Sequence, residues 1–299
     1  MNSIIVIGSS NTDMVIRSPR IPVPGETIIG GSFFTNPGGK GANQAVAAAR
    51  LGGKVVFVTR TGNDSFGKES FDGFRREGID LTYASIDPLH PSGVALITVD
   101  DKGENTIVVA SGANSMLTPD VFEAKLPPMD SHDTMLLQLE IPMDTVIRGA
   151  AYARQQNARV ILNPAPACEL TDDLLKNVSI ITPNETEASF LSRVPVKGKD
   201  SAARAASLLQ RRGPKTVIIT LGSQGAIVLD GHELYPVPAP SVTAVDTTAA
   251  GDVFNGALAV GLAEGIPLDQ AVEFACKAAA ISVTRQGAQS SAPNRKEVQ

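Results

Sequence analysis

Short, uninterrupted apolar runs recur along the chain, and segments with helical spacing separate them. The apolar runs occupy residues 4–7, 55–58, 135–139 (where Gln138 is the one polar residue), 160–162, 180–181 and 217–219. The helical segments fall near residues 42–51, 64–77, 143–156, 185–191, 201–212, 250–264 and 268–284. A strand that is apolar throughout needs cover on both faces, and strand–helix alternation makes neighbouring strands parallel. The sequence therefore predicts an α/β fold, a three-layer α/β/α sandwich around a mostly parallel central sheet.

Two stretches, residues 13–35 and 92–110, break this alternation. They mix apolar and polar residues without helical spacing, and Pro19, Pro22 and Pro24 interrupt the first of them. We predict antiparallel strands that stand off the main sheet, inserted into a single domain spanning residues 1–299. One apolar face of so small a sheet needs cover, from closure over a site, from a second copy of the chain, or from both. Open α/β sheets bind ligands at one edge, which favours a lid over an ordinary edge extension of the sheet.

The composition excludes several classes of function. With 26 Lys and Arg against 31 Asp and Glu, the net charge of −5 opposes binding to nucleic-acid phosphates. No apolar run reaches the length of about 18 residues that a membrane helix needs. Two cysteines give no disulfide framework, and three scattered histidines give no zinc site. We therefore expect a cytoplasmic protein with neither a nucleic-acid partner nor a membrane partner.

The segment from Asp246 to Asp252, with the sequence DTTAAGD, runs directly into a predicted helix. Small residues let an anion approach the backbone, and the first turn of a helix offers unpaired N–H groups and a positive dipole end. Together these features predict an anion site. A carboxylate beside a phosphate is costly unless it has a chemical role, and accepting a proton from an attacking hydroxyl during phosphoryl transfer is such a role for Asp252. Helix capping by Asp and Thr is the alternative explanation.

A second cluster, GGKGAN from Gly38 to Asn43, opens another predicted helix. It is not a P-loop, because no Ser or Thr follows the lysine and the glycine spacing differs. Ligands of open α/β sheets collect at the carboxyl ends of strands, where amides and carboxylates can bind adjacent sugar hydroxyls. This cluster and two strand ends supply five side chains of the right chemistry, namely Asn11, Asp13, Lys40, Asn43 and Glu140. For each of them taken alone, turn formation or a helix start is the alternative.

Two further turns follow predicted strands. In TPNETE, residues 182–187, Asn184 and Glu187 lie three apart and share a helix face. An amide and an acid at this spacing suit hydrated Mg²⁺ beside a phosphate, and they equally suit a capping box. The glycine-rich TLGSQG, residues 220–225, suits either the underside of a nucleotide or a plain tight turn.

Taken in order, these motifs resemble the ribokinase family of carbohydrate kinases. The resemblance runs from Gly8 to Ser291 and is most specific in GKGANQA (39–45), NPAPA (163–167), TPNETEA (182–188), TLGS (220–223) and DTTAAGD (246–252). It implies transfer of the γ-phosphate of ATP to the 5-hydroxyl of D-ribose, with Mg²⁺, a monovalent cation such as K⁺, and a homodimer joined through the β-sheet lid. A related kinase of fructose, deoxyribose or a keto-deoxy sugar acid is an alternative, as is a sugar- or nucleotide-sensing protein without turnover.

The resemblance also implies roles for individual residues. Asp252 is the implied general base, and the backbone at Ala249, Ala250 and Gly251 is the implied anion hole. The implied sugar contacts are Asn11, Asp13, Gly39, Lys40, Asn43, Glu140 and Asp252. The implied nucleotide contacts are Asn184, Thr220, Leu221, Gly222, Ser223, Gly225, Gly251 and Cys276. Glu187 is the acid implied to organise Mg²⁺, and the implied K⁺ ligands are Asp246, Thr248, Ser282, Arg285, Gly287 and Ser291.

Two residues depart from the family pattern. Glycine is usual where Ala249 stands; alanine keeps the N–H donor, so the anion hole survives unless the backbone there needs a positive φ. Cys276 stands where relatives often place a polar ring or amide near adenine. A further expectation concerns Asp252, which at a helix N-terminus should favour its ionised form and act as a weak base until the sugar hydroxyl acidifies.

Overall fold

The computed structural model describes residues 2–298, and its largest element is an eight-stranded sheet. The order across the sheet is β14-β13-β12-β11-β10-β9-β1-β4. Its strands are β1 (Ser3–Ile7), β4 (Lys54–Val58), β9 (Thr134–Leu137), β10 (Arg159–Leu162), β11 (Ile180–Ile181), β12 (Thr216–Thr220), β13 (Ala226–Asp230) and β14 (Glu233–Val237). Strands from β4 to β12 in sheet order pair in parallel, whereas β13 and β14 form an antiparallel hairpin at one edge. The predicted mostly parallel sheet is confirmed.

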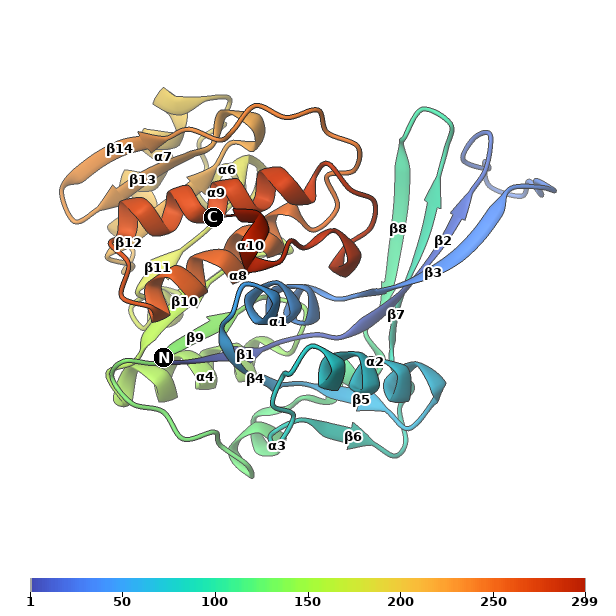
Figure 1. The fold of residues 1–299 in the computed structure, drawn as a ribbon, viewed down its shortest axis with the longest axis horizontal. Helices are drawn as coiled ribbons and strands as arrows, with labels where there is room; N and C mark the ends of the chain where they lie inside the picture. The colour runs from blue at the N-terminus through green and yellow to red at the C-terminus, as the bar shows by residue number, and fades with distance from the viewer. Residues whose placement is uncertain (1, 299) are drawn as a thin grey trace.

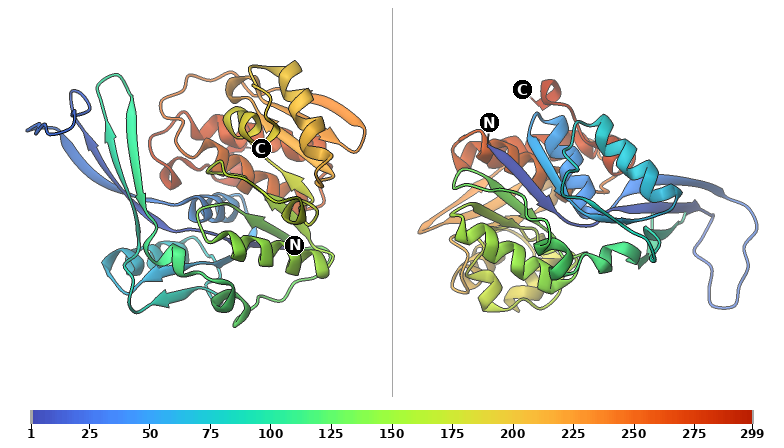
Figure 2. Two further views of the ribbon diagram at one scale, coloured as in Figure 1. Left: turned by 180° about the vertical axis from the view of Figure 1, so that it is seen from behind. Right: turned by 90° about the horizontal axis from the view of Figure 1, so that it is seen from below.

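Helices cover both faces of this sheet (Figures 1 and 2). Because successive side chains on a strand point to opposite faces, Ile4 and Val6 join one apolar core while Ile5 and Ile7 join another. The first core contains residues of α1 (Lys40–Arg50), α2 (Ser65–Arg76), α8 (Ala250–Ala263), α9 (Leu268–Ser282) and α10 (Arg295–Val298). The second contains residues of α3 (Pro119–Glu123), α4 (Met143–Gln155), α5 (Asp172–Leu175), α6 (Glu185–Ser192) and α7 (Lys199–Gln210). The three-layer prediction is therefore confirmed.

Helix α8 determines where the predicted catalytic residue lies. Residues 252–263 are all buried, because α8 packs against α1, α9 and the sheet. A Cβ placed on Gly256 would lie 2.8 Å from the carbonyl oxygen of Gln44 and 2.9 Å from the Cβ of Ala47. Only glycine permits so close an approach of α8 to α1. This packing places the first turn of α8 beside the N-terminal part of α1.

A four-stranded sheet projects from the body as a lid (Figure 1). It consists of β3 (Ser32–Gly38), β2 (Asn11–Arg17), β7 (Gly93–Val99) and β8 (Asn105–Ala110), in that order. The pairing is antiparallel except in the middle, where β2 runs parallel to β7. Residues 18–31 form a long connection outside the strands, so the predicted lid segment 13–35 consists of two strand segments and this connection.

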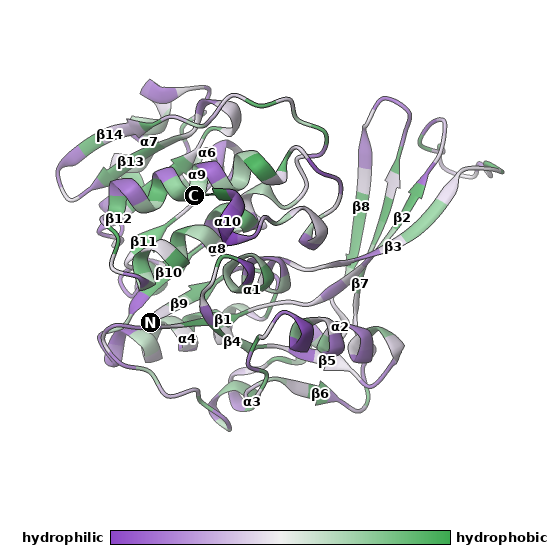
Figure 3. Cartoon of the chain, in the orientation of Figure 1, coloured by the Kyte–Doolittle hydropathy of each residue, from purple (hydrophilic) through white to green (hydrophobic). Residues whose placement is uncertain are grey.

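The strands of the lid carry apolar residues (Figure 3). Several of them are exposed to solvent, including Phe33 at 64 % and Val108 at 69 % exposure. A short two-stranded sheet, β5 (Arg60–Gly62) with β6 (Ser85–Asp87), lies beside α2. Among the helices of residues 2–298, none combines the length and the apolar character that crossing a bilayer requires.

Candidate active site

Asp252 lies in the first turn of α8, is 5 % exposed, and is held on both carboxylate oxygens by α1. Asn43 Nδ2 donates to Asp252 Oδ2 over 2.9 Å. Gln44 Nε2 donates to Asp252 Oδ1, also over 2.9 Å. Two motifs thus meet at one carboxylate, although Asn43 and Gln44 precede Asp252 by 209 and 208 residues in the sequence. The general base that the sequence predicts is fixed in position before any substrate binds.

Buried amides continue this contact into the protein. Gln44 Nε2 donates a second hydrogen bond to Asn163 Oδ1 over 3.0 Å, and Gln44 Oε1 accepts from Gln138 Nε2 over 2.6 Å. Sequence reasoning assigned no role to Gln44, Gln138 or Asn163. The sequence did contain a signal for two of them. Gln138 directly follows β9 and Asn163 directly follows β10, so both lie at the carboxyl edge of the sheet, as Glu140 does.

The amide chain returns to α8 through two further side chains. Asn163 Nδ2 donates to the carbonyl oxygen of Thr182 over 3.3 Å, and Thr182 Oγ1 donates to Asn255 Oδ1 over 2.6 Å. Asn255 Nδ2 then donates to the carbonyl oxygen of Gly251 over 2.8 Å. The carboxylate of Asp252 and the backbone of the predicted anion hole therefore belong to one hydrogen-bonded network.

Burial raises the pKa of Asp252 above its ordinary value, although Lys40 and the hydrogen bonds from Asn43 and Gln44 act in the opposite direction. The expectation that the helix N-terminus would make Asp252 readily ionised is therefore wrong. Removing a carboxylate from water costs more free energy here than the helix dipole and the hydrogen bonds return. A raised pKa makes the ionised carboxylate a stronger proton acceptor, which suits a general base.

Ala249 precedes α8 with φ 59° and ψ 12°, in the left-handed region. The backbone at this position therefore needs a positive φ, which glycine adopts freely. Alanine adopts it at a cost of roughly 1–2 kcal/mol. Ala250 N donates to the carbonyl oxygen of Thr247 over 3.3 Å, which closes the turn before the helix. The next N–H groups, starting with that of Gly251, lie in the first helical turn and have no intrahelical acceptor. They can bind an anion.

The predicted sugar residues gather beside Asp252. Glu140 Oε2 accepts from Ser9 Oγ over 2.6 Å and from the Lys40 backbone N over 3.0 Å, so the end of β9 is tied to the start of α1. Asn43 Oδ1 is buried and finds no hydrogen-bond partner within residues 2–298. A buried acceptor without a partner is available to a ligand hydroxyl.

Asn11 at the start of the lid is held by a residue that the sequence did not single out. Asn114 Nδ2 donates to Asn11 Oδ1 over 2.7 Å, while Asn114 Oδ1 accepts from Ser10 N over 2.9 Å. The side-chain oxygen of Asn11 is thereby engaged, so a ligand contact of Asn11 would use its amide nitrogen as the donor. A Cβ on Gly38 would lie 2.3 Å from Asp13 Oδ1, so a larger residue there would displace the Asp13 carboxylate. Gly39 has φ 89°, a backbone conformation that favours glycine.

The ammonium group of Lys40 interacts with several carboxylates of the site. Burial by itself lowers the pKa of Lys40, but Asp252, Glu140, Glu187 and Asp13 together raise that pKa above its ordinary value. Burial also raises the pKa of Asp13 to about 6, with help from Glu140 and Asp252 and with opposition from Lys40. Lys40 is therefore charged, whereas Asp13 titrates close to neutral pH.

On the nucleotide side, the capping-box alternative for Asn184 and Glu187 is confirmed. Glu187 N donates to Asn184 Oδ1 and Asn184 N donates to Glu187 Oε2, each over 2.9 Å. Burial raises the pKa of Glu187, and the charge of Asp252 adds to this effect. Thr220 N donates to the carbonyl oxygen of Pro183 over 3.0 Å, which brings the TLGSQG turn beside the start of α6. Asn184 Nδ2 also donates to Glu187 Oε1 over 3.0 Å, so both polar atoms of the Asn184 side chain are engaged by Glu187 in this structure.

The TLGSQG turn is a short 3₁₀ turn, Gly222–Gln224, closed by a hydrogen bond from Leu221 N to the Gly225 carbonyl oxygen over 2.7 Å. Gly225 has φ 87°, and a Cβ there would lie 2.0 Å from the carbonyl oxygen of Val237.

Cys276 lies within the apolar core at 4 % exposure, and burial raises the pKa of its thiol to about 12. The thiol offers adenine little surface, so its predicted contact is at most a small one.

Asp246 joins the start of the predicted anion loop to the C-terminal segment. Its Oδ1 accepts from Thr248 N and its Oδ2 from Gly287 N, each over 2.9 Å. Burial raises the pKa of Asp246, but these hydrogen bonds and the charge of Arg17 hold it below the ordinary value, so the carboxylate is ionised. The structure thus brings together three of the six residues implied as K⁺ ligands.

The other three implied K⁺ ligands make contacts of their own. The hydroxyl of Ser282 donates to the carbonyl oxygen of Ala279, and that of Ser291 donates to the carbonyl oxygen of Ala288, each over 2.8 Å. Arg285 forms an ion pair with Glu297. The side chain of Arg285 is therefore directed to a carboxylate, and only its backbone oxygen suits a cation.

A cavity of about 680 Å³ lies between the lid and these loops. Asp13, Phe34 and Asn36 line it from the lid, and Asp246 and Thr248 line it from the predicted anion loop. Its size suits a small ligand.

Comparison with known proteins shows which family the chain belongs to. The family model described as pfkB family carbohydrate kinase matches residues 1–295. The chain belongs to this family. It is 46 % identical over 295 residues to a ribokinase of Haemophilus influenzae, covering 99 % of this chain and 96 % of the relative.

Two solved ribokinases are closely similar to this chain in structure. The ribokinase of Thermotoga maritima matches with a TM-score of 0.90 at 40 % identity, covering 100 % of this chain and 98 % of that one. The ribokinase of Arabidopsis thaliana complexed with ribose and ATP matches with a TM-score of 0.90 at 33 % identity, with the same coverage of both chains. The family resemblance predicted from the sequence motifs is therefore confirmed, and the chain is a carbohydrate kinase.

Proposed function

We propose that this chain is a ribokinase, which transfers the γ-phosphate of ATP to the 5-hydroxyl of D-ribose and releases D-ribose 5-phosphate and ADP. The observation that carries the proposal is the buried carboxylate of Asp252, held by Asn43 and Gln44 at the first turn of α8. A general base and a set of anion-binding N–H groups then lie on the same helical turn. Phosphoryl transfer needs both at one point.

In the proposed reaction, the proton of the ribose 5-hydroxyl passes to the carboxylate of Asp252. The hydroxyl oxygen forms a bond to the γ-phosphorus as the bond from that phosphorus to the β,γ-bridging oxygen breaks, and the bond electrons leave with ADP. The N–H groups of the first turn of α8 face the charge that develops on the transferring phosphoryl group. Donors fixed before the reaction stabilise such charge without reorganising, by about 3–4 kcal/mol for a strong donor.

The sugar specificity follows from the polar groups around Asp252. Asn43 Oδ1 is an acceptor without a partner among residues 2–298, Asp13 and Glu140 supply carboxylates, and Asn11 supplies an amide donor. These groups suit a ring of adjacent hydroxyls. A sugar that already carries a phosphate fits less well, because Lys40 is the only cation among the predicted sugar contacts. Deoxyribose, fructose and a keto-deoxy sugar acid remain as alternatives for the assay.

We further propose Mg²⁺ as a cofactor that enters with ATP. Within residues 2–298, no three His, Cys, Asp or Glu side chains converge on a metal position. Mg²⁺ is commonly held by substrate phosphates and water with only one or two protein carboxylates, and Glu187 is the predicted one. When bound, the ion neutralises charge on the phosphates.

A potassium ion beside the anion loop is the second proposed cofactor. The ionised carboxylate of Asp246 with neighbouring backbone and hydroxyl oxygens suits a large, weakly hydrated cation, and the ion would hold the loop in shape. The test replaces K⁺ with Na⁺ or a tetraalkylammonium ion at constant ionic strength, so that screening is unchanged. A fall in kcat that Cs⁺ or NH₄⁺ reverses supports the site, and equal rates in all salts contradict it.

We also propose a homodimer joined through the lids. Strand alternation directs Phe34 and Ile97 toward the cavity, and therefore directs Phe33, Leu96 and Val108 to the opposite face of the lid. These last three residues are each more than half exposed, which leaves an apolar face that a second copy of the same face would cover.

The decisive assay for the proposed function measures ADP release with a panel of sugars. Ribose, deoxyribose, fructose, a keto-deoxy sugar acid and a phosphorylated sugar are compared by kcat/KM, and the phosphorylated carbon is assigned by phosphorus NMR. Ribose is expected to be the best substrate, with phosphate on its 5-hydroxyl. A higher kcat/KM for another sugar assigns that sugar instead, and tight sugar binding without ADP release indicates a sensing protein.

A further inference from the structure

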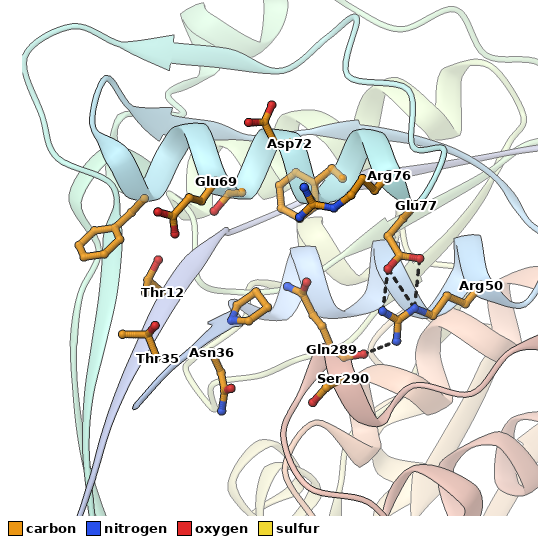
Figure 4. A pocket seen from close by; sticks show the side chains of 15 residues that line it. Thr12, Thr35, Asn36, Arg50, Glu69, Asp72, Arg76, Glu77, Gln289 and Ser290 are labelled. Carbon is orange, nitrogen blue, oxygen red and sulfur yellow. Dashed lines mark hydrogen bonds and ion pairs between the residues drawn. The ribbon is translucent and has the colours of Figure 1, made fainter. Parts of the chain in front are cut away.

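The C-terminal strap, residues 286–292, lies between two hollows of the protein. On one side it borders the cavity under the lid, through Gly287 and Ser290. On the other side, Gln289 and Ser290 border a second cavity of about 490 Å³ between α1, α2 and the base of the lid (Figure 4). Ala288, Ser291 and Ala292 of the strap are buried, whereas Gln286 and Ser290 are exposed, so directed hydrogen bonds add to packing in holding the strap in place.

Arg50, in the last turn of α1, provides such hydrogen bonds. Its Nη1 donates to the carbonyl oxygen of Gln289 over 2.6 Å and to that of Ala292 over 3.2 Å. Glu77, at the end of α2, fixes the same guanidinium, with 2.6 Å from Arg50 Nη2 to Glu77 Oε1 and 3.1 Å from Arg50 Nε to either carboxylate oxygen (Figure 4). Arg50 therefore ties both α1 and α2 to the strap.

The opposite side of the strap is tied to the anion loop. Gly287, two residues before Gln289, donates from its backbone N to Asp246 Oδ2 over 2.9 Å. Asp246 Oδ1 accepts from Thr248 N, the residue before the strained Ala249. Direct contacts thus lead from Arg50 through the strap to the turn that presents the first N–H groups of α8.

We propose that Arg50 is a positioning residue for the anion hole. By holding the carbonyl groups of Gln289 and Ala292, it fixes Gly287 against Asp246 and so sets the backbone of the loop from Asp246 to Asp252. A planar guanidinium can reach Glu77 and both carbonyl oxygens at once, whereas a lysine ammonium on a flexible stem cannot hold all three. Arg50 is not among the predicted sugar or nucleotide contacts, so we expect its loss to act on the transition state rather than on ribose binding.

The experiment compares Arg50→Lys with a matched control, Arg295→Lys. Arg295 is also a partly exposed arginine, at 28 % against 22 % for the side chain of Arg50. It also pairs with a glutamate, Glu264, and donates to a backbone carbonyl oxygen, that of Leu51, but its hydrogen bonds do not reach the strap. Two readouts are taken: steady-state kinetics with ATP and ribose, and hydrogen exchange of peptides covering residues 246–252 and 283–292.

For Arg50→Lys, kcat is expected to fall about 10- to 100-fold, the cost of a small misplacement of catalytic groups, while the KM for ribose stays within about twofold. Hydrogen exchange of both peptides is expected to speed up, and Arg295→Lys is expected to show neither change. Unchanged exchange of residues 246–252 in Arg50→Lys overturns the proposal, as does an equal fall in kcat in the control. The kinetic readout rests on the proposed function. If the wild-type protein phosphorylates no sugar, that function fails, and the exchange readout alone decides the role of Arg50.

Discussion

Gln44 donates from Nε2 to Asp252 Oδ1 over 2.9 Å and holds the candidate general base in one orientation. The side-chain oxygen of Gln44 accepts from Gln138 over 2.6 Å, so the amide is held with its nitrogen toward the carboxylate. The hydrogen bond stabilises the ionised form of the carboxylate and so opposes the effect of burial, which raises the pKa of Asp252.

Replacing Gln44 with leucine is expected to raise the pKa of Asp252 further, because a hydrogen bond that lowers this pKa is lost. A general base works only when ionised, so the acidic limb of the kcat–pH profile should move to higher pH. Buried amides left without partners should also lower the free energy of unfolding by about 1–3 kcal/mol. Stopped assays across the pH range, with circular dichroism at each pH, measure both effects. An acidic limb that does not move contradicts the role given to Gln44.

The pKa of Asp13, raised to about 6, predicts that ribose affinity depends on pH. The ionised carboxylate accepts hydrogen bonds from sugar hydroxyls, so the KM for ribose should rise as the pH falls below about 6, near that pKa. Asp13→Asn should raise the KM and remove this dependence. A KM for ribose that varies with pH equally in both proteins assigns the titration to another group.

Stability gives an independent check on Asp13. Because its pKa in the folded protein is raised from the ordinary 3.8 to about 6, the folded state binds this proton more tightly than the unfolded state does. Its contribution to the free energy of unfolding therefore falls as the pH rises between these two values and stays low above them. Asp13→Asn should flatten that part of a plot of Tm against pH.

Ala249→Gly tests the left-handed backbone before α8. Glycine adopts φ 59° without a Cβ clash, but it also increases the entropy of the unfolded chain. The two effects together predict a gain of up to about 1 kcal/mol in the free energy of unfolding. The N–H donor is retained, so kcat should change by less than about threefold. Chemical denaturation and initial rates measure both quantities, and a loss of stability would show that the alanine is not strained.

Val108→Asp tests the lid dimer. Placing a charge in the apolar face that the second copy covers should shift the protein to monomers in light scattering at micromolar concentration. Leu234→Asp is the matched control, because Leu234 is exposed on a strand, β14, that lies outside the lid. A wild-type protein that is monomeric and fully active under these conditions contradicts the proposed dimer.

Much of the fold followed from local patterns, because the parallel strands of the main sheet are largely buried on both faces and therefore read as apolar runs. The lid was less predictable: the parallel pairing of β2 with β7 depends on a long connection through the body. Sequence motifs also identified the region around Asp252. The amides of Gln44, Gln138 and Asn163 were missed. Gln138 and Asn163 directly follow strands, which is a signal in the sequence, but Gln44 lies within α1, and which side chains the three amides meet depends on how the chain folds.

The electrostatic prediction for Asp252 was wrong for a related physical reason. The helix N-terminus is visible in the sequence, whereas burial by the packing of α8 on α1 is not, and burial has the larger effect on the pKa. Cys276 shows the same limit. Its position in the chain suggested a contact with adenine, while the structure buries its side chain in the apolar core.

The central claim, that Asp252 accepts the proton of the sugar hydroxyl, is tested most directly by the turnover of Asp252→Asn with ATP and ribose. Calorimetric ATP binding and circular dichroism confirm that the variant is folded and binds nucleotide. We expect kcat to fall by about 10²–10⁴-fold, the usual contribution of a general base, with ATP affinity unchanged. A folded variant that binds ATP and turns over at a near wild-type rate would contradict this claim.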